Sequence, residues 1–384
     1  MDATLADDED LVGLICSRLP CLFDQIGVQQ LSRCWRAAVA RLPPPLPLIL
    51  LPDGGPLSCV AAGLCSHNLR IPEYARGARY FGAYAGGWVF LAIGHSSDHV
   101  LFNLRTHQII RVPDQLRISC HHLSRSREAV IIAATLSSSP TDPNCIGAAI
   151  SQGRSIGKFV CTFWLLRVSK LALGINVSHS HGLEDLIYYD GAFHFLTSKE
   201  DLLIFRLSEF SDDGLISSAS AQQVIRSFSA SGDGRDYGSH RVLRYLVESR
   251  GNLLMVTRIL SAPKIEFKLF EMEEKRTEPL HNGSISYNWK QIHSLDGRIL
   301  FLARGCSKSY DMSDYPELED AIYFLDDGRS YKDYTFFSEG AVPRYPCCSD
   351  SGKWLEAKKP GLNVVEFLRE QEPSTCSPPT WFFP

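Results

Sequence analysis

The sequence lacks the strong charge bias of proteins that bind nucleic acid. Its 384 residues include 39 Lys and Arg against 43 Asp and Glu, a formal net charge of −4. No long cluster of Lys and Arg occurs, whereas nucleic-acid platforms normally carry a basic stripe. Long apolar runs are also missing, because the longest stretch, 159–175, contains Arg167 and Lys170 and falls short of the roughly 20 apolar residues that span a bilayer. We therefore predict no nucleic-acid partner and no membrane segment.

Features of exported proteins are scarce as well. A signal peptide has a basic start and an apolar run, but residues 1–10 read MDATLADDED and are acidic. The 12 cysteines are scattered, without a C-x-x-C pair, and Cys347 and Cys348 are adjacent. In a reducing compartment such cysteines are mostly buried small hydrophobes or surface thiols. We expect a protein of the cytoplasm or the nucleus.

The motifs of common enzymes are absent or lack their structural context. There is no G-x-x-x-x-G-K-[ST] and no G-x-G-x-x-G. Residues 153–157 (GRSIG) match the hydrolase pattern G-x-S-x-G, but that nucleophile elbow requires a helix after the serine, and a β-rich run begins at Lys158. We predict a hairpin turn there and expect that Ser155 is not a nucleophile.

Candidate metal ligands do not have the spacing that a metal site requires. Residues 120–122 (CHH) and the pair His179 and His181 have no partner pair at zinc spacing, and neighbouring residues on a strand point to opposite faces. The acidic segment 311–320 has no EF-hand spacing, which favours a solvated loop. We predict no metal, no cofactor and no catalytic residue, and therefore a non-enzymatic binding protein.

Residues 8–42 have the periodicity of helices. Asp8–Asp10 place negative charge where a helix N-terminus favours it, and Pro20 ends the first segment. A short apolar segment at 22–26 leads into a third periodic segment, after which Pro43–Pro47 stops helix formation. Residues on one face by this spacing are Leu11, Leu14, Ile15 and Leu19 in the first segment and Leu31, Cys34, Trp35, Ala38 and Leu42 in the last.

From about residue 78 the pattern changes to short β-rich runs separated by turns. The pairs Asp190-Gly191 and Asp296-Gly297 predict tight hairpin turns because Gly and Asp tolerate positive φ. With no long amphipathic helix between the runs, a closed or radially repeated β architecture is the natural way to hide the strand edges. The expected strands are 86–93, 100–104, 109–112, 129–136, 158–168, 186–189 with 193–196, 202–207, 242–247 with 253–260, 265–270, 292–295 with 298–303, and 321–325.

One radially repeated β architecture is the β-propeller, whose blades are sheets arranged around an axis. The strand–turn–strand units of this sequence recur too irregularly to give the number of blades. Propeller strands use aromatic residues for packing between blades, so we predict that Trp88 and Trp164 are core residues and not a ligand platform. In many propellers the last strand returns to close the ring, which directs attention to the C-terminal residues.

The N-terminal helical region resembles an F-box. Residues 9–20 (EDLVGLICSRLP) and 31–38 (LSRCWRAA) follow the F-box order of an apolar helix ending in Arg-Leu-Pro and a later Cys and Trp-Arg. This resemblance implies binding of a Skp-type adaptor. The matching apolar positions are Leu11, Leu14, Ile15, Leu19, Pro20 and Trp35. Asp7 and Asp8 stand where the F-box pattern has Leu-Pro, so the resemblance predicts weak adaptor binding.

The remainder resembles the Kib-type β-propeller domain that accompanies F-boxes in a large plant family. In the first matching segment, Asn103-Leu104 stands where the pattern of this family has Asn-Pro. The segments that carry the resemblance, in order, are 87–89 with 101–104 and 110–113, 185–191, 245–249 with 253–256, 294–302, 321–324 and 378–384.

Together the patterns predict a mainly β protein: a three-helix F-box-like module (1–42), a linker and lead-in (43–77), and a β-propeller (78–384). The resemblance implies a substrate-recognition subunit of a Skp–cullin–F-box ubiquitin ligase, whose propeller binds an unidentified target protein while partners carry the transfer chemistry. Two alternatives stay open. One is a sequestering propeller with a degenerate F-box, and the other is an enzyme that uses the central channel.

Overall fold

The computed structural model describes residues 9–19, 21–51, 57–59, 66–67, 71–93, 98–118, 125–153, 159–176, 182–208, 210, 221–228, 235–261, 264–276, 285–326, 351–356, 363–366, 374 and 376–384. Three helices come first: α1 (Glu9–Ser17), α2 (Leu22–Gln29) and α3 (Arg33–Ala40). Ser32 caps α3 by accepting a hydrogen bond from the Trp35 backbone N–H at 3.4 Å. The prediction of a small three-helix module before the β region is confirmed.

The helices enclose a small core of their own. Val12 and Cys16 of α1 and Ala38 and Val39 of α3 are buried together. Half-buried residues complete this core: Val28, Cys34, Trp35 and Leu42.

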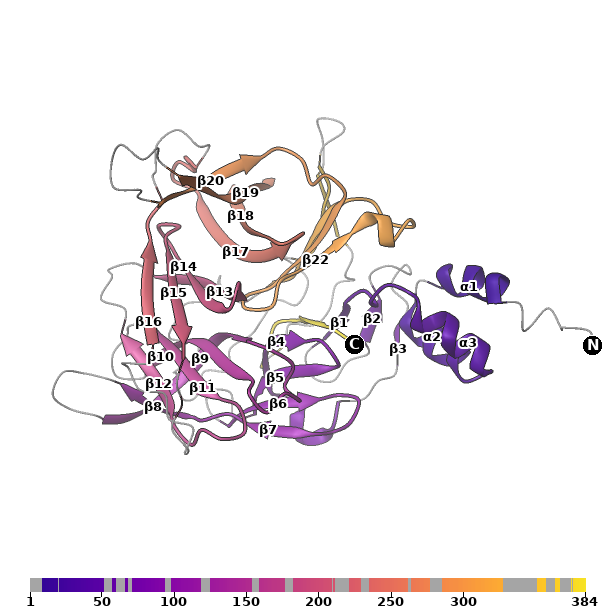
Figure 1. Ribbon diagram of the computed structural model, residues 1–384, viewed down its shortest axis with the longest axis horizontal. Coiled ribbons are helices and arrows are strands. Elements are labelled where there is room, and N and C mark those ends of the chain that lie inside the picture. The colour runs from indigo at the N-terminus through magenta and orange to yellow at the C-terminus, as the bar shows by residue number, and fades with distance from the viewer. Residues whose placement is uncertain are drawn as a thin grey trace, which may run out of the picture.

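The strands of the described residues form six sheets arranged in a ring (Figure 1), and the second blade along the chain closes on itself as a five-stranded barrel. Five of them are blades that each use one continuous stretch of chain, and the sixth joins the two ends of the chain. This mainly β propeller confirms the predicted fold class.

The blade strands have the following bounds. The first blade contains β4 (Arg79–Tyr84), β5 (Trp88–Ala92), β6 (His99–Asn103) and β7 (Ile109–Arg111), and the second contains β8 (Gln115–Ile118), β9 (Arg125–Leu136), β10 (Ile146–Gly153), β11 (Phe159–Leu165) and β12 (Ala172–Asn176). The third contains β13 (Leu183–Tyr189), β14 (Ala192–Thr197), β15 (Leu202–Leu207) and β16 (Ala221–Arg226). The fourth contains β17 (Arg241–Ser249), β18 (Asn252–Ser261), β19 (Lys264–Arg276) and β20 (Ile285–Ile292), and the fifth β21 (Arg298–Leu302), β22 (Lys308–Asp311), β23 (Ala321–Phe324), β24 (Gly352–Trp354) and β25 (Val364–Val365).

The joining sheet closes the ring. It contains β1 (Leu48–Leu50), β2 (Leu57–Cys59), β3 (Ser66–His67) and β26 (Thr380–Phe382), in the order β26-β1-β2-β3. Leu48 pairs with Phe382 in antiparallel register. The segment 43–77 therefore supplies strands β1, β2 and β3 to this sheet, and the expected return of the last strand is observed.

Local turn chemistry explains the hairpin between β13 and β14. Asp190 and Gly191 adopt φ values of 47° and 69° and connect β13 to β14, as predicted. The prediction of a hairpin over 292–303 is wrong. Asp296-Gly297 does form a turn, but β20 pairs with β19, while β21 pairs with β22 and β23. The turn therefore connects two blades, because a positive φ specifies a reversal of the chain and not its pairing partner.

Aromatic residues pack between blades. Trp88 on β5 and Trp164 on β11 are buried in one cluster, and the Trp164 ring meets the Phe90 ring edge-on at a centroid distance of 6.2 Å. The prediction that both tryptophans are core residues is confirmed.

Candidate functional site

Helix α1 has one apolar side turned inward and another turned outward. Val12 and Cys16 are 1% and 0% exposed, whereas Leu14 and Ile15 are 58% and 40% exposed. Leu11 is half-buried, and by the i, i+3, i+4 spacing it lies on the same side as Leu14 and Ile15. We call Leu11, Leu14 and Ile15 the α1 apolar face. Exposed large apolar side chains at adjacent positions of a helix are typical of a surface that binds a partner.

The predicted adaptor-binding residues do not all lie on this face. Leu19 is half-buried, and Pro20 lies outside the described residues. Trp35 is half-buried and packs against the core of the helical module, so it has a structural role there. The sequence patterns did not lead us to predict that Val12 and Cys16 form a buried side of α1. Their i, i+4 spacing is the signal that indicates such a side.

The helical module packs against the joining sheet. Leu22 and Phe23 of α2 contact a propeller core cluster that includes Leu48 and Phe382. The Sγ atoms of Cys21 and Cys59 are 3.7 Å apart, and the Tyr315 hydroxyl donates a hydrogen bond to the Pro44 carbonyl oxygen. These contacts fix the position of the module relative to the propeller.

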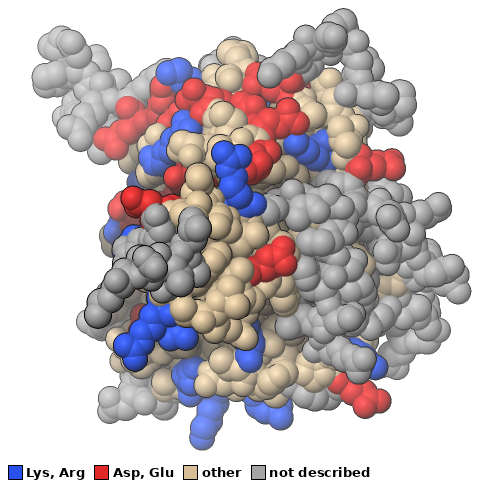
Figure 2. All heavy atoms as spheres, turned by 90° about the vertical axis from the view of Figure 1, so that its right-hand side faces the viewer, with Lys and Arg blue, Asp and Glu red and all other residues tan. Residues whose placement is uncertain are grey.

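Charges on the side of the molecule that carries the helices are unevenly distributed, although basic side chains also lie among the acidic ones. Figure 2 looks onto this side: most acidic side chains lie in its upper part, basic side chains line its lower edge, and uncharged side chains fill much of the area between them. Helix α3 contributes the exposed basic residues Arg33 and Arg36. A partner that bound across this side would meet charges of both signs at the margins of an uncharged area.

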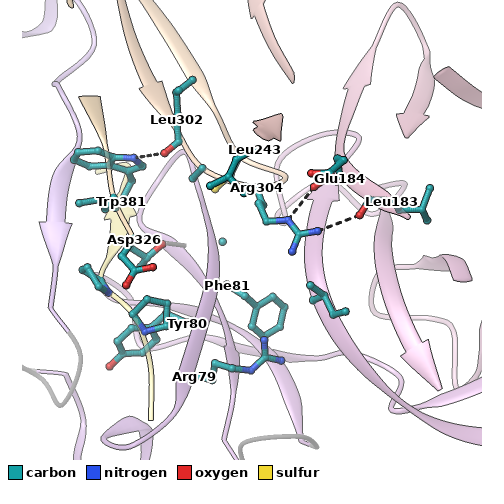
Figure 3. Close-up of a pocket in the computed structure, with 18 of the residues that line it drawn as sticks. Arg79, Tyr80, Phe81, Leu183, Glu184, Leu243, Leu302, Arg304, Asp326 and Trp381 are labelled. Atoms are coloured by element: carbon teal, nitrogen blue, oxygen red, sulfur yellow. Dashed lines mark hydrogen bonds between the residues drawn. The ribbon is translucent and has the colours of Figure 1, made fainter. Parts of the chain in front are cut away.

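A second candidate site lies where the blades converge. A cavity of about 380 Å³ is lined by residues at the ends or on the inner strands of all six sheets. Its charged residues are Arg79, Arg241, Arg304, Glu184 and Asp326. We call it the axial cavity (Figure 3). Its volume lies in the range of about 300–1,000 Å³ that is usual for small-molecule sites.

Backbone acceptors hold two of the arginines in place. Arg304 follows β21 and reaches toward β13, where its Nε donates to the Glu184 carbonyl oxygen at 2.9 Å and its Nη2 to that of Leu183 at 3.4 Å (Figure 3). The Nη2 of Arg79 donates to the Ile131 carbonyl oxygen at 2.6 Å, and its guanidinium lies 4.7 Å from the Phe81 ring centroid. Both cations are therefore oriented before any ligand arrives.

The thiol in the described lining of the axial cavity is not activated as a nucleophile. Cys306 is the one thiol among these lining residues, and burial raises its pKa to about 12, which keeps it protonated and unreactive at neutral pH. The described residues contain no group of three or more His, Cys, Asp or Glu side chains placed to hold a metal ion. Ser155, Cys120, His121, His122, His179 and His181 lie outside the described residues.

Two carboxylates of the acidic segment 311–320 make contacts within the protein. Asp311 accepts hydrogen bonds from the Ser313 backbone N–H and hydroxyl and pairs with Arg250 at 2.8 Å. The hydrogen bonds from Ser313, followed by the one from Arg250, lower the pKa of this carboxyl. Glu319 pairs with Lys353 at 2.9 Å. Most residues of the segment are exposed, in agreement with the predicted solvated loop, but Met312–Asp314 form a short 3-10 helix.

The ring of sheets defines a β-propeller. The family model described as the KIB1-4 beta-propeller matches residues 63–338, and the chain belongs to this family. The matched region begins after the three helices and does not include them. None of the described helices is both long and apolar enough to span a bilayer.

Other comparisons add little. No curated protein matches the chain. Among solved structures, the crystal structure of the major allergen Mala s 1 of Malassezia sympodialis is 10% identical, with 75% of this chain and 86% of that chain covered and a TM-score of 0.24.

Proposed function

We propose that this protein is the substrate-recognition subunit of a Skp–cullin–F-box ubiquitin ligase in the cytoplasm or nucleus. The helical module binds a Skp-type adaptor through the α1 apolar face, and the propeller binds the target protein. The propeller fold suggests a protein-binding role because it presents loops on a rigid frame. Ubiquitin transfer is then carried out by partner subunits, and we propose no catalytic residue in this chain.

The observation that carries the proposal is the outward side of α1. The helical module already has its own core around Val12 and Cys16, yet Leu14 and Ile15 stay exposed at 58% and 40%. Fully burying an aliphatic side chain of this size contributes about 1.5–3 kcal/mol. Two such residues are enough to act as interface anchors, because a few buried side chains usually carry most of the binding energy.

A binding titration of the full chain with a Skp adaptor tests the proposal. We expect Ile15→Asp to abolish binding, because it places a carboxylate in an apolar interface. The matched control is Ile225→Asp on β16, where the side chain is 46% exposed but lies on the third blade. Ile225→Asp should bind as the wild type does. Equal loss in both variants would contradict the assignment of the α1 apolar face.

The alternative is a sequestering propeller whose F-box no longer binds the adaptor, and the sequence favours it at one point. Asp7 and Asp8 replace the Leu-Pro of the F-box pattern, which removes apolar burial and adds two charges. Restoring Leu-Pro by Asp7→Leu/Asp8→Pro should tighten binding about tenfold to a hundredfold, at about 1.4 kcal/mol per tenfold. If neither the wild type nor this variant binds the adaptor, the ligase proposal fails and the sequestering function replaces it.

A further inference from the structure

Two thiols meet where the helical module joins the propeller. Cys21 directly precedes α2, which lies beside the joining sheet (Figure 1), and Cys59 is the last residue of β2 in that sheet. The Sγ atoms of the two residues are 3.7 Å apart, and both residues are 2% exposed. A disulfide bond places its sulfurs about 2.0 Å apart, so these two must approach each other by about 1.7 Å to form one.

Backbone hydrogen bonds hold the chain in place around both thiols. The Cys21 carbonyl oxygen accepts a hydrogen bond from the Gln25 backbone N–H at 3.1 Å in the first turn of α2, and the Cys21 side chain does not cap this helix. Cys59 pairs with Leu48 of β1 in antiparallel register. Because the backbone and not the thiols forms these elements, rotation of the two side chains can join the sulfurs while α2 and β2 stay in place.

A small pocket provides room for an oxidant beside Cys59. Its volume is about 120 Å³, and it lies between the helical module, the proline-rich segment 43–47 and residues 314–318. Cys59 belongs to its lining, as do Leu19 and Leu22 of the helical module. A water-sized molecule needs about 10–15 Å³ of such volume, so a molecule as small as hydrogen peroxide fits.

We propose that Cys21 and Cys59 are a redox modification site and form a reversible disulfide bond when hydrogen peroxide oxidises the protein. Peroxide transfers one oxygen atom to the Cys59 thiol, which gives a sulfenic acid and one molecule of water. The Cys21 sulfur then attacks the Cys59 sulfur, the S–O bond breaks, and the hydroxyl leaves with the thiol proton of Cys21 as a second molecule of water. Both sulfurs are oxidised and both peroxide oxygens are reduced. Two molecules of a monothiol such as glutathione reverse the reaction and leave as glutathione disulfide.

The disulfide tethers the helical module to the propeller. It joins two positions that are 38 residues apart in the sequence, and the loop that it closes contains α2, α3 and β1. Such a cross-link stabilises a folded protein because it restricts the unfolded chain. It also prevents separation of the module from the joining sheet, where Leu22 and Phe23 otherwise hold it by packing alone. The proposal does not depend on adaptor binding.

Two other buried thiols serve as internal references. Burial raises the pKa of Cys161 well above its usual value and that of Cys306 to about 12. Thiols that stay protonated at neutral pH are poor nucleophiles, so both should remain reduced under mild oxidation.

The test is mass spectrometric mapping of the folded full chain after mild treatment with hydrogen peroxide. The oxidised protein is denatured in iodoacetamide, which blocks the remaining thiols, and is then digested with trypsin without a reductant. Trypsin releases Cys21 in peptide 19–33, whereas peptide 42–70 contains both Cys59 and Cys65, so fragmentation of the linked peptides identifies the second cysteine. We expect a link between Cys21 and Cys59 that dithiothreitol removes.

A matched pair of variants makes the result specific. Cys59→Ser should abolish the link, whereas Cys65→Ser, which changes the same tryptic peptide, should keep it. Urea unfolding of the wild type gives an independent measurement, because oxidation should raise the midpoint by roughly 1 M and dithiothreitol should reverse this rise. Absence of the link between Cys21 and Cys59 in the oxidised wild type, its formation only in urea, or equally frequent linkage of Cys21 to Cys65 would each overturn the proposal.

Discussion

At the residue scale, one buried carboxylate ties three blades together near the axis. Asp185 on β13 is 0% exposed and accepts hydrogen bonds from the backbone N–H groups of Leu186, Leu246 and Gly305 at 2.8, 2.7 and 2.7 Å. Leu246 belongs to β17, and Gly305 lies between β21 and β22. A buried charge is tolerable only when such donors satisfy it, so Asp185 fixes the relative positions of these blades.

Gly305 is required at this junction for two reasons. Its φ is 74°, and a Cβ placed there would lie 2.0 Å from the Ala134 carbonyl oxygen, which also accepts a hydrogen bond from the Tyr84 hydroxyl at 2.7 Å. Gly251 separates the two effects, because it has a φ of 78° but no atom lies within 4 Å of the place that a Cβ would occupy. An alanine at Gly251 therefore changes the backbone preference alone.

We expect Gly251→Ala to lower the free energy of unfolding by about 1–2 kcal/mol, the cost of a left-handed conformation for a residue with a Cβ. Gly305→Ala should lower it by a further 1–3 kcal/mol or so, because β9 must also move. Urea unfolding followed by circular dichroism measures both values. Equal losses in the two variants would show that the close approach to Ala134 has no energetic consequence.

Stability should also depend on the protonation of a buried histidine. His194 on β14 is 2% exposed, and burial lowers its pKa from 6.5 to about 4, against a smaller opposing effect of its hydrogen bond to the Ala192 carbonyl oxygen. The unfolded chain therefore binds a proton that the folded chain does not. The contribution of neutral His194 is complete above pH 6.5 and is lost as the pH falls toward 4.

From these two pKa values, the wild type should lose about 2 kcal/mol through His194 between pH 7 and pH 5. His194→Gln removes this titration and leaves other groups, including the buried His99, to titrate as before. The difference between the two proteins in urea unfolding at pH 7 and pH 5 isolates the effect. If both proteins lose the same free energy between these pH values, His194 does not have a depressed pKa.

At the element scale, the strand that closes the ring depends on a single large side chain. Trp381 on β26 is 0% exposed, meets the Phe301 ring edge-on at 5.1 Å, and donates a hydrogen bond from Nε1 to the Leu302 carbonyl oxygen at 2.9 Å. Because β26 pairs with β1, this contact connects the fifth blade to the sheet that joins the chain ends.

Trp381→Ala should destabilise the fold by about 3–5 kcal/mol through the cavity it leaves. Trp381→Phe keeps most of the packing and removes the hydrogen bond donor, so its loss should be about 1–3 kcal/mol, mainly from the Leu302 carbonyl oxygen left without this partner. Chemical unfolding of both variants measures the order. A loss in Trp381→Ala no greater than in Trp381→Phe would mean that packing by Trp381 does not hold the closing strand.

Elements that depend on local chemistry could be predicted from the sequence, and those that depend on distant pairing could not. The hairpin around Asp190-Gly191 follows from two residues that tolerate positive φ. Strand β1 has three residues and pairs with β26 at the other end of the chain, so no local pattern reveals it. Similarly, the axial cavity takes a few residues from each sheet, and periodicity alone does not identify which strand ends face the axis.

At the scale of the whole molecule, the two candidate sites lie on different parts of one framework. The α1 apolar face belongs to a module that packs on the joining sheet through Leu22 and Phe23, and the axial cavity lies inside the ring. The resemblance identified the helical module but could not show which side of α1 is outward. That assignment follows from burial of Val12 and Cys16, which leaves Leu14 and Ile15 for a partner.

The most direct test of the proposed receptor function is affinity purification of the full chain from cells treated with a proteasome inhibitor, followed by quantitative mass spectrometry. The wild type should recover a Skp adaptor, a cullin and a ubiquitinated target protein. Ile15→Asp should lose the adaptor and the cullin but retain the target, because the propeller is unchanged. Recovery of a target by the wild type without any adaptor or cullin would contradict the proposal.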